Sequence, residues 1–497
     1  MWLASMKIKI YFSDVFDLSP NVVREYGALD VSLINDLPLF IDPFLLFNSR
    51  KPEYQQLHNR MIDYLKFLRD RSEGGPLSPG LINAWFSFSE IRQNWLGYSL
   101  VGNAGRGLGP SFANALHNNL HTVFKHFGDE QITRGAHLEK LCLIKDGVGR
   151  DNISDFATNL IKGFLLEYTE TFASEHIRAE LRKKVHISKV AFNYSTQSWQ
   201  TREFDLPWAY GDYVILTPRD LLTKDDTWIS RADLIRSYDD IAASIPNQQL
   251  RDQLNNYFVS ALPKRRNKQP SEKERHEAAA RAIDKFPELI EYYIAEKENT
   301  GDEAESVSAQ RVRESERLLI ENVRKLASLL SESAFYRIPA VPSTFDDAMA
   351  RVQFLKDVIE NKGGHRIFYV NGQPVEREKD LHILYRLTWF ASVSAIDAEV
   401  NNGRGPVDYS VSYGAADKSL VEFKLASNSH LAKNLTNQTR IYEKAGDARK
   451  SITVITFFSK EDLARVERIV REVGRDKDKT IVLIDARNDN KPSGSKA

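Results

Sequence analysis

Two short polar segments near the C-terminus combine residue types that could bind a divalent cation. Asp408 lies in GRGPVDYSVS, and Glu422 and Lys424 lie in SLVEFKLA. Two carboxylates and a carbonyl oxygen make the hard oxygen site that magnesium prefers. The ion would stabilise charge on a phosphate and help to create the attacking hydroxide. A lysine beside it could orient that water or neutralise developing charge, so these residues predict hydrolysis of a phosphodiester bond.

The order of polar and apolar residues predicts the elements that position these groups. Both segments alternate polar and apolar side chains, as strands with one buried face do. Gly414 lies in the stretch 413–418, which we expect to form the hairpin turn. Because the side-chain period is two, Glu422 and Lys424 point to the same face, and the adjacent strand can bring Asp408 beside them.

The bare pattern of an aspartate followed by Glu-x-Lys is weak evidence, since about one chance match is expected in a chain of this length. Asp346 and Glu360-Asn361-Lys362 repeat it with the same gap of thirteen residues. That second match lies in a helical pattern which ends at Gly363-Gly364, so we reject it. The alternative interpretation of the strand pair is a solvated face with cross-strand ion pairs.

Three motifs resemble those of the PD-(D/E)XK nuclease superfamily. Pro406-Val407-Asp408 looks like its first motif and Glu422-Phe423-Lys424 like its second. Gln438-Thr439-Arg440-Ile441-Tyr442 is similar to the Q-x-x-x-Y element of the RecB-like branch. The resemblance implies a restriction-endonuclease-like αβββαβ core, with a central mixed sheet flanked by helices.

The resemblance also implies roles for individual residues. Asp408, Glu422 and the Phe423 carbonyl would hold Mg²⁺, for which Mn²⁺ could substitute. Lys424 would position or activate water. Gln438 would support the substrate or the lysine, and Tyr442 and Arg404 would contact the substrate. Glu378 would be the acidic residue of the preceding helix, a position for which Glu376 and Glu399 compete. Structural alternatives are a core role for Tyr442 and a first-turn helix-dipole role for Glu378.

Composition shifts divide the chain into three regions, which predicts a multidomain α/β protein. Residues 1–263 are mixed α/β of unassigned fold, a candidate recognition or regulatory module. Residues 264–345 form a charged helical connector, expected as an antiparallel helical pair, and residues 346–497 form the nuclease domain. The Ser271-Glu272-Lys273-Glu274 capping-box pattern starts the first connector helix.

Periodicity and turn signals predict further elements. We expect the following: strands at 7–12, at 37–47 up to the Asp42-Pro43 turn, at 189–194 and at 213–217; helices at 54–69, 111–127, 156–177, 346–360 and from Glu378 to Phe390; and a hairpin at 367–370 with Asn371-Gly372. The resemblance adds a strand at 452–458, a helix at 461–473 and a strand at 480–486.

Composition excludes some classes of protein. The 68 basic and 68 acidic residues cancel, so any nucleic-acid site must be a local patch. Cys142 is the single cysteine, which rules out an intrachain disulfide and a cysteine-rich zinc cluster. The chain has no apolar run of about 18 residues, so we expect no membrane contact and a cytoplasmic location.

Four other motifs have a structural explanation as well as a functional one. The glycine-rich stretch 102–109, with Arg106, could cradle phosphate, but a flexible loop explains it. The histidines at 117, 121 and 126 could bind metal, but surface or helix-cap positions explain them. For the carboxylates at 146–155, Asp151 or Ser154 as a helix N-cap is the alternative to a second catalytic centre. The basic stretch 264–268 is a solvated linker or a phosphate contact.

The sequence therefore predicts a magnesium-dependent endonuclease or exonuclease that acts on nucleic acid, with DNA favoured over RNA. By architecture it resembles effectors of bacterial anti-phage or restriction-type defence systems, which is an analogy only. Expected partners are nucleic acid and either a second copy of the chain or a companion defence protein. The rival hypotheses are a non-catalytic nucleic-acid-binding or assembly protein and a small-molecule hydrolase centred on residues 102–109.

Overall fold

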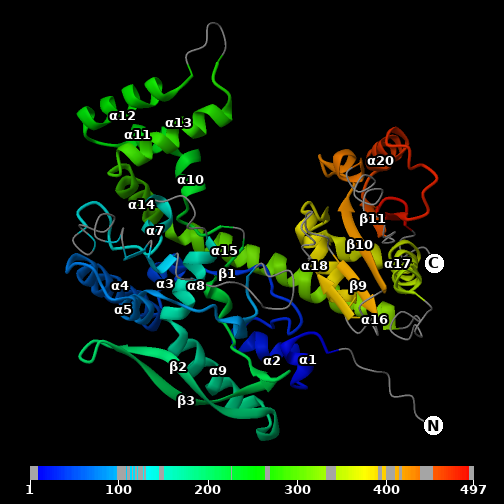
Figure 1. Ribbon diagram of the computed structural model, residues 1–497, viewed down its shortest axis with the longest axis horizontal. Coiled ribbons are helices and arrows are strands. Elements are labelled where there is room, and N and C mark those ends of the chain that lie inside the picture. Colours follow the sequence, from blue (N-terminus) through cyan, green and yellow to red (C-terminus); the bar gives the residue numbers. More distant parts are fainter. Residues whose placement is uncertain are drawn as a thin grey trace.

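The computed structural model describes residues 9–97, 108, 112–114, 116–117, 120, 127, 130–144, 150–224, 226–263, 269–331, 343–389, 395–398, 409–413, 417–436 and 451–491. These residues form a multidomain mixed α/β protein that is mostly helical and carries several small sheets. Figure 1 shows the N-terminal elements on one side and the largest sheet, with its helices, on the other. No helix among the described residues is long and apolar enough to cross a bilayer.

Helices make up most of the N-terminal part, with one long hairpin. Its elements are α1 (Phe12–Val15), α2 (Pro20–Glu25), β1 (Phe40–Ile41), α3 (Pro43–Asn48), α4 (Pro52–Glu73), α5 (Pro79–Phe86), η1 (Arg92–Asn94), α7 (Lys140–Ile144), α8 (Arg150–Leu160), α9 (Lys162–His176), η2 (Ala179–Leu181), β2 (Arg182–Asn193), β3 (Ser198–Ala209), β4 (Asp212–Tyr213), η3 (Arg219–Leu221), β5 (Leu222–Thr223), α10 (Arg231–Arg236), α11 (Tyr238–Ser244) and α12 (Gln248–Ala261).

Several expected elements of this part are wrong. The strand expected at 7–12 does not continue through residue 12. Tyr11 makes an isolated bridge to Ser32, and α1 then begins because the Asp14 carboxylate accepts the Tyr11 N–H at 3.0 Å. The strand expected at 213–217 ends at Tyr213. Beyond it, backbone N–H groups bond outside a ladder, for example from Leu216 to the Thr169 hydroxyl at 2.9 Å.

Two further expectations are corrected in position. The strand expected at 37–47 is only two residues long, and a helix follows it where a turn was expected. Asp42 caps this helix, α3, by accepting the Phe44 N–H at 3.0 Å. The helix expected at 156–177 is interrupted at Ile161, between α8 and α9. Ser154 lies inside α8 and is not its N-cap. The helix at 54–69 is confirmed within α4, and most of 111–127 lies outside the described residues.

The connector begins as predicted and then differs. Ser271 and Glu274 form the capping box that starts α13 (Glu272–Lys285). Further helical segments follow it: α14 (Leu289–Asn299), α15 (Gly301–Glu316), the π-helical segment η4 (Arg317–Glu321) and α16 (Asn322–Ser331). The apolar side chains of η4 and α16 repeat at helical spacing and are fully buried at Leu319, Val323, Leu326 and Leu330.

The helical run from α15 through η4 to α16 joins the two parts of the molecule (Figure 1). Arg324 of α16 forms ion pairs with Asp14 at 2.8 Å and Asp30 at 2.9 Å, on the N-terminal side. The same helix packs against α17 (Thr344–Asn361) and α18 (Glu378–Trp389) on the C-terminal side. The connector is therefore a packed element and not a loose linker.

The C-terminal sheet has five strands in the order β12-β11-β10-β9-β8. They are β8 (Ala395–Ala398), β9 (Tyr409–Tyr413), β10 (Asp417–Leu425), β11 (Ser451–Phe457) and β12 (Ile481–Asp485). β8, β9 and β10 are antiparallel, and β10, β11 and β12 are parallel. α20 (Lys460–Glu472) supplies the crossover that the parallel strands β11 and β12 need.

Predictions for this part agree well with the described residues. The two strands around the turn, the helices expected at 346–360 and 378–390, and the three elements expected after residue 450 are all confirmed to within two residues. β6 (Tyr369–Val370) and β7 (Gln373–Pro374) pair across Asn371 and Gly372, both at positive φ, as the hairpin signal predicts. The short 3-10 helix η6 (Gly364–Phe368) precedes this hairpin.

Candidate functional site

Helix α18 and strand β10 bring two of the predicted residues together. Lys424 Nζ lies 2.9 Å from Glu378 Oε1, with side chains 11% and 23% exposed. Such a short charge-assisted bond in a partly enclosed position fixes both groups more firmly than an exposed pair would. The helix and the strand thus meet at a lysine and a carboxylate that a solute can still approach.

Packing between the same two elements explains this position. Glu422 and Lys424 are partly exposed, whereas Val421, Phe423 and Leu425 between and beside them are buried, as the period of two predicts. The Phe423 ring stacks on Tyr385 of α18, with ring centroids 3.8 Å apart and planes tilted by 18°. This contact anchors α18, so Glu378 in its first turn reaches Lys424.

Two residues that sequence reasoning missed complete the arrangement. His382 Nε2 lies 2.7 Å from the carbonyl oxygen of Phe423, so this nitrogen carries a hydrogen and donates it. The carbonyl proposed as a metal ligand therefore already accepts one hydrogen bond, and a carbonyl has a second lone pair. Asn428 Nδ2 donates to Glu378 Oε2.

A signal for one of these residues was present in the sequence. His382 follows Glu378 by four residues, so both lie on one face of α18, and the His382 ring is 3.8 Å from Glu378 Oε1. Asn428 follows β10 in a turn that Arg465 of α20 holds by donating to the carbonyls of Ala426 and Asn428. That contact joins distant segments, which local spacing does not reveal.

The other predicted residues are not brought together by the described structure. Asp408, Arg404, Gln438 and Tyr442 lie outside the described residues, as do Glu399 and most of the glycine-rich stretch 102–109. Glu376 is described and exposed. Among the described residues there is no group of three or more His, Cys, Asp or Glu side chains arranged to hold a metal ion.

An ion pair connects α18 to the N-terminal part. Lys224 Nζ, just after β5, lies 3.0 Å from Asp380 Oδ2, and both side chains are about one-tenth exposed, at 12% and 11%. Asp380 is two residues from Glu378. Arg311 of α15 donates to the Lys224 carbonyl at 3.2 Å, which fixes this segment. The first turn of α18 is therefore held from outside its own sheet.

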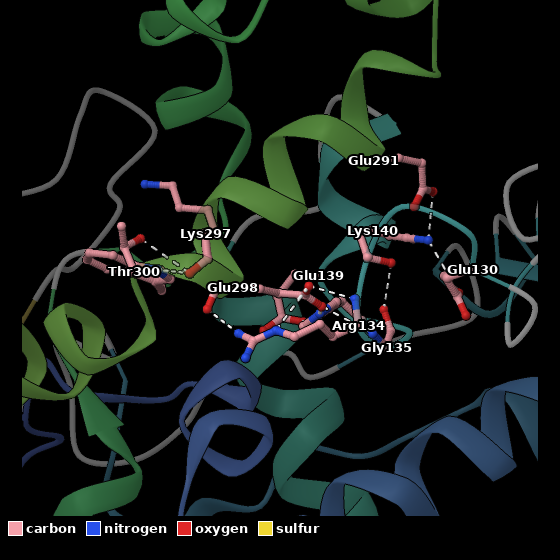
Figure 2. Close-up of polar contacts among 12 residues, drawn as sticks. Glu130, Arg134, Gly135, Glu139, Lys140, Glu291, Lys297, Glu298 and Thr300 are labelled. Atoms are coloured by element: carbon pink, nitrogen blue, oxygen red, sulfur yellow. Dashed lines mark hydrogen bonds and ion pairs between the residues drawn. The ribbon is translucent and has the colours of Figure 1, made fainter. Parts of the chain in front are cut away.

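A second cluster of ionisable residues joins residues 130–140 of the N-terminal part to α14 of the connector (Figure 2). The Glu298 carboxylate, on α14, accepts the N–H of Arg134 at 2.7 Å, the N–H of Gly135 at 3.2 Å and His137 Nε2 at 2.8 Å. Beside it, Lys140 lies between Glu130 at 3.4 Å and Glu291 at 2.8 Å. These contacts clamp the segment 130–140 onto α14.

Glu139 differs from the other carboxylates of this cluster because its side chain has no hydrogen-bond partner within the described part of the chain. Its side chain is fully buried, and among the described residues neither carboxylate oxygen has a hydrogen-bond partner; His137 Nδ1 is 3.9 Å away. Burial, followed by the nearby carboxylate of Asp42, raises the pKa of Glu139 to about 8, and burial also raises the pKa of Asp42. Glu139 is therefore protonated at neutral pH.

Glu298, which holds the segment 130–140 on α14, keeps its charge. Burial alone would raise the pKa of Glu298, but hydrogen bonds from His137 and from the Arg134 N–H outweigh it, so this pKa is lowered. Burial lowers the pKa of His137, which leaves the ring neutral. The result is a buried, charged Glu298 held by two backbone N–H groups and a neutral histidine, with the half-exposed guanidinium of Arg134 3.5 Å away.

Two family models match parts of the chain. Residues 17–230 match a domain of unknown function (DUF8370), and residues 344–460 match another domain of unknown function (DUF8371). Each covers less than half of the chain, and the second contains Glu378, Glu422 and Lys424. A search of curated proteins and a search of solved structures each found no match.

Proposed function

We propose that the C-terminal part is a magnesium-dependent nuclease of the PD-(D/E)XK type, with a restriction-endonuclease-like core. The observation that carries the proposal is the contact of Lys424 on β10 with Glu378 on the preceding helix, 2.9 Å apart, beside Glu422 on the same strand. The order of elements supports it: α18 is followed by three antiparallel strands, β8, β9 and β10, and then by β11 and β12, which run parallel to β10 and have α20 between them.

The donor set fits a hard divalent cation. Glu422 and Glu378 offer carboxylate oxygens, and the Phe423 carbonyl oxygen lies between them in sequence and accepts from His382. Asp408 would complete the set: it directly precedes Tyr409, which pairs with Val421, the residue before Glu422. Bound magnesium would stabilise the negative charge that grows on the phosphate.

The side chains of the chain would carry the other tasks. Lys424 orients the attacking water, whose oxygen bonds to phosphorus as the bond to the leaving oxygen breaks. The attacking water gives up one proton to solvent, and the leaving oxygen takes up a proton from solvent. Glu378 and Asn428 hold the lysine in place, and Gln438, Tyr442 and Arg404 would contact the substrate. We propose nucleic acid as the substrate, DNA before RNA, and a role as an effector in antiviral defence.

The experiment is a cleavage assay with the full-length protein. It uses single- and double-stranded DNA and RNA, each with magnesium, with manganese and with chelator. We expect cleavage with either metal, none with chelator, and none for Asp408→Ala or Glu422→Ala. Binding of nucleic acid without cleavage in any condition would overturn the nuclease and favour the non-catalytic binding protein.

A further inference from the structure

A pocket of about 400 Å³ lies between α4, α9 and the β2–β3 hairpin, on the far side of the molecule from β10 (Figure 1). This volume is in the range that accommodates a small ligand or a large side chain. Nothing in the proposed nuclease mechanism uses it.

Aromatic rings form the inner wall of this pocket. They are Tyr64, Phe164, Phe192, Tyr194 and Trp199. The Tyr64 hydroxyl donates to the Trp85 carbonyl at 2.8 Å and accepts from Trp199 Nε1 at 3.2 Å, so the rings are held in place. The faces of such rings carry negative charge density and attract cations.

One face of α4 forms the polar rim. Glu53, Gln56, Arg60 and Asp63 follow one another at three- and four-residue spacing, so they line up on the helix. All four are exposed, and none makes a hydrogen bond or ion pair with another described residue. These side chains are therefore available to a ligand.

The charge of the rim is negative. Arg202 and Glu167 neutralise each other across 2.7 Å. The unpaired charges are then the carboxylates of Glu53 and Asp63 and the guanidinium of Arg60. Asp63 and Tyr194 both line the pocket, and burial, with the Asp63 carboxylate adding to it, raises the pKa of Tyr194 to about 12.

Backbone features at the rear of the pocket fit a formed site. A Cβ at Gly163 would lie 2.9 Å from the carbonyl oxygen of Val190, so only glycine allows α9 to approach β2 this closely. The pairing of β2 with β3 shifts register between Ile187 and Ala191. Such a bulge re-aims the side chains that follow it, here those of Val190 and Phe192 on the pocket wall.

We propose that this pocket binds an organic cation: an ammonium or guanidinium group on an aliphatic stem. Its source is either a free polyamine or a lysine or arginine side chain of a partner protein. Aromatic faces and two unpaired carboxylates favour a cation, whereas the phosphate of a nucleotide would meet Glu53 and Asp63. The proposal stands independently of the nuclease.

Calorimetric titration of the full-length protein tests this proposal. The probes are spermidine, the peptide acetyl-Gly-Arg-Gly-amide and, as an anion, adenosine monophosphate. We expect at least one cationic probe to bind, more weakly as salt is added. Binding of spermidine alone identifies a free amine as the ligand, and binding of the peptide alone identifies a partner side chain.

Variants of α4 localise the binding. Glu53→Gln combined with Asp63→Asn should weaken the binding of the cationic probe by about tenfold. Glu73→Gln removes one negative charge from the same helix outside the pocket and should leave the affinity unchanged. All of these positions are exposed, so melting temperatures should match. Unchanged affinity in the double variant, tighter binding of adenosine monophosphate or the absence of any binding heat would overturn the proposal.

Discussion

The two clusters of ionisable residues differ in how their charges are balanced. Around Lys424, opposite charges meet at a partly exposed junction of one helix and one strand. Around Glu298, a carboxylate that is almost fully buried accepts from backbone N–H groups and a neutral histidine, and the Arg134 guanidinium lies 3.5 Å away. The first arrangement leaves charged groups within reach of a substrate, whereas the second uses polar contacts to join chain segments. Substitutions should therefore change activity in the first and stability in the second.

The largest effect on stability is expected for Glu298→Ala. The substitution leaves the N–H groups of Arg134 and Gly135 and the His137 ring without their acceptor. Breaking a buried network of this kind costs about 3–5 kcal/mol of unfolding free energy. Urea denaturation measures the unfolding free energy. The control is Glu296→Ala, an exposed position on the same helix α14. Equal stability of the two variants would show that the clamp is not a structural element.

Stability should also depend on pH through Glu139. Its pKa is raised from 4.5 to about 8 by burial and by Asp42, so the folded state binds a proton that the unfolded state releases. This contribution is complete below pH 4.5 and is lost as the pH rises toward 8, by up to about 1.4 kcal/mol per unit.

The variant Glu139→Gln keeps the shape of the protonated acid without titrating. We expect the fall in unfolding free energy from pH 5 to pH 8 to be smaller than in the unaltered protein. Thermal or urea unfolding across this range is the measurement. An identical pH dependence in both proteins would mean that Glu139 is ionised in the folded state.

The Lys224–Asp380 ion pair extends the comparison because it links the N-terminal part to α18 of the C-terminal part. Lys224→Met leaves a nearly buried carboxylate without its partner and should cost about 1–3 kcal/mol. Because Asp380 is two residues from Glu378, cleavage should fall as well. Adding Asp380→Asn should restore most of the stability. A double variant no more stable than Lys224→Met would show that the two side chains are not coupled.

The smallest effect is expected for His382→Ala. The loss of the hydrogen bond to the Phe423 carbonyl, 2.7 Å long, should loosen this oxygen and lower the cleavage rate by about tenfold, equivalent to about 1.4 kcal/mol. The unfolding free energy should change little, since the ring is partly exposed. A full cleavage rate would remove His382 from the site.

The sequence allowed prediction of one cluster and not of the other for a physical reason. Alternation around Phe423 is a local pattern, and it sufficed to place Glu422 and Lys424 on one face of a strand, whereas Glu378 was a candidate only through the family resemblance. The Glu298 clamp joins residues about 160 positions apart, so no local period records it. Local capping by Asp14 likewise overrode the strand pattern before it, as side-chain bonds to the backbone often do.

The central claim is that Lys424 serves catalysis and not merely the packing of α18. The most direct test compares cleavage by Lys424→Met with cleavage by Lys477→Met, an exposed lysine between α20 and β12. We predict that Lys424→Met loses cleavage at least a hundredfold while it still melts as one cooperative unit and that Lys477→Met cleaves normally. Normal cleavage by folded Lys424→Met would contradict the account.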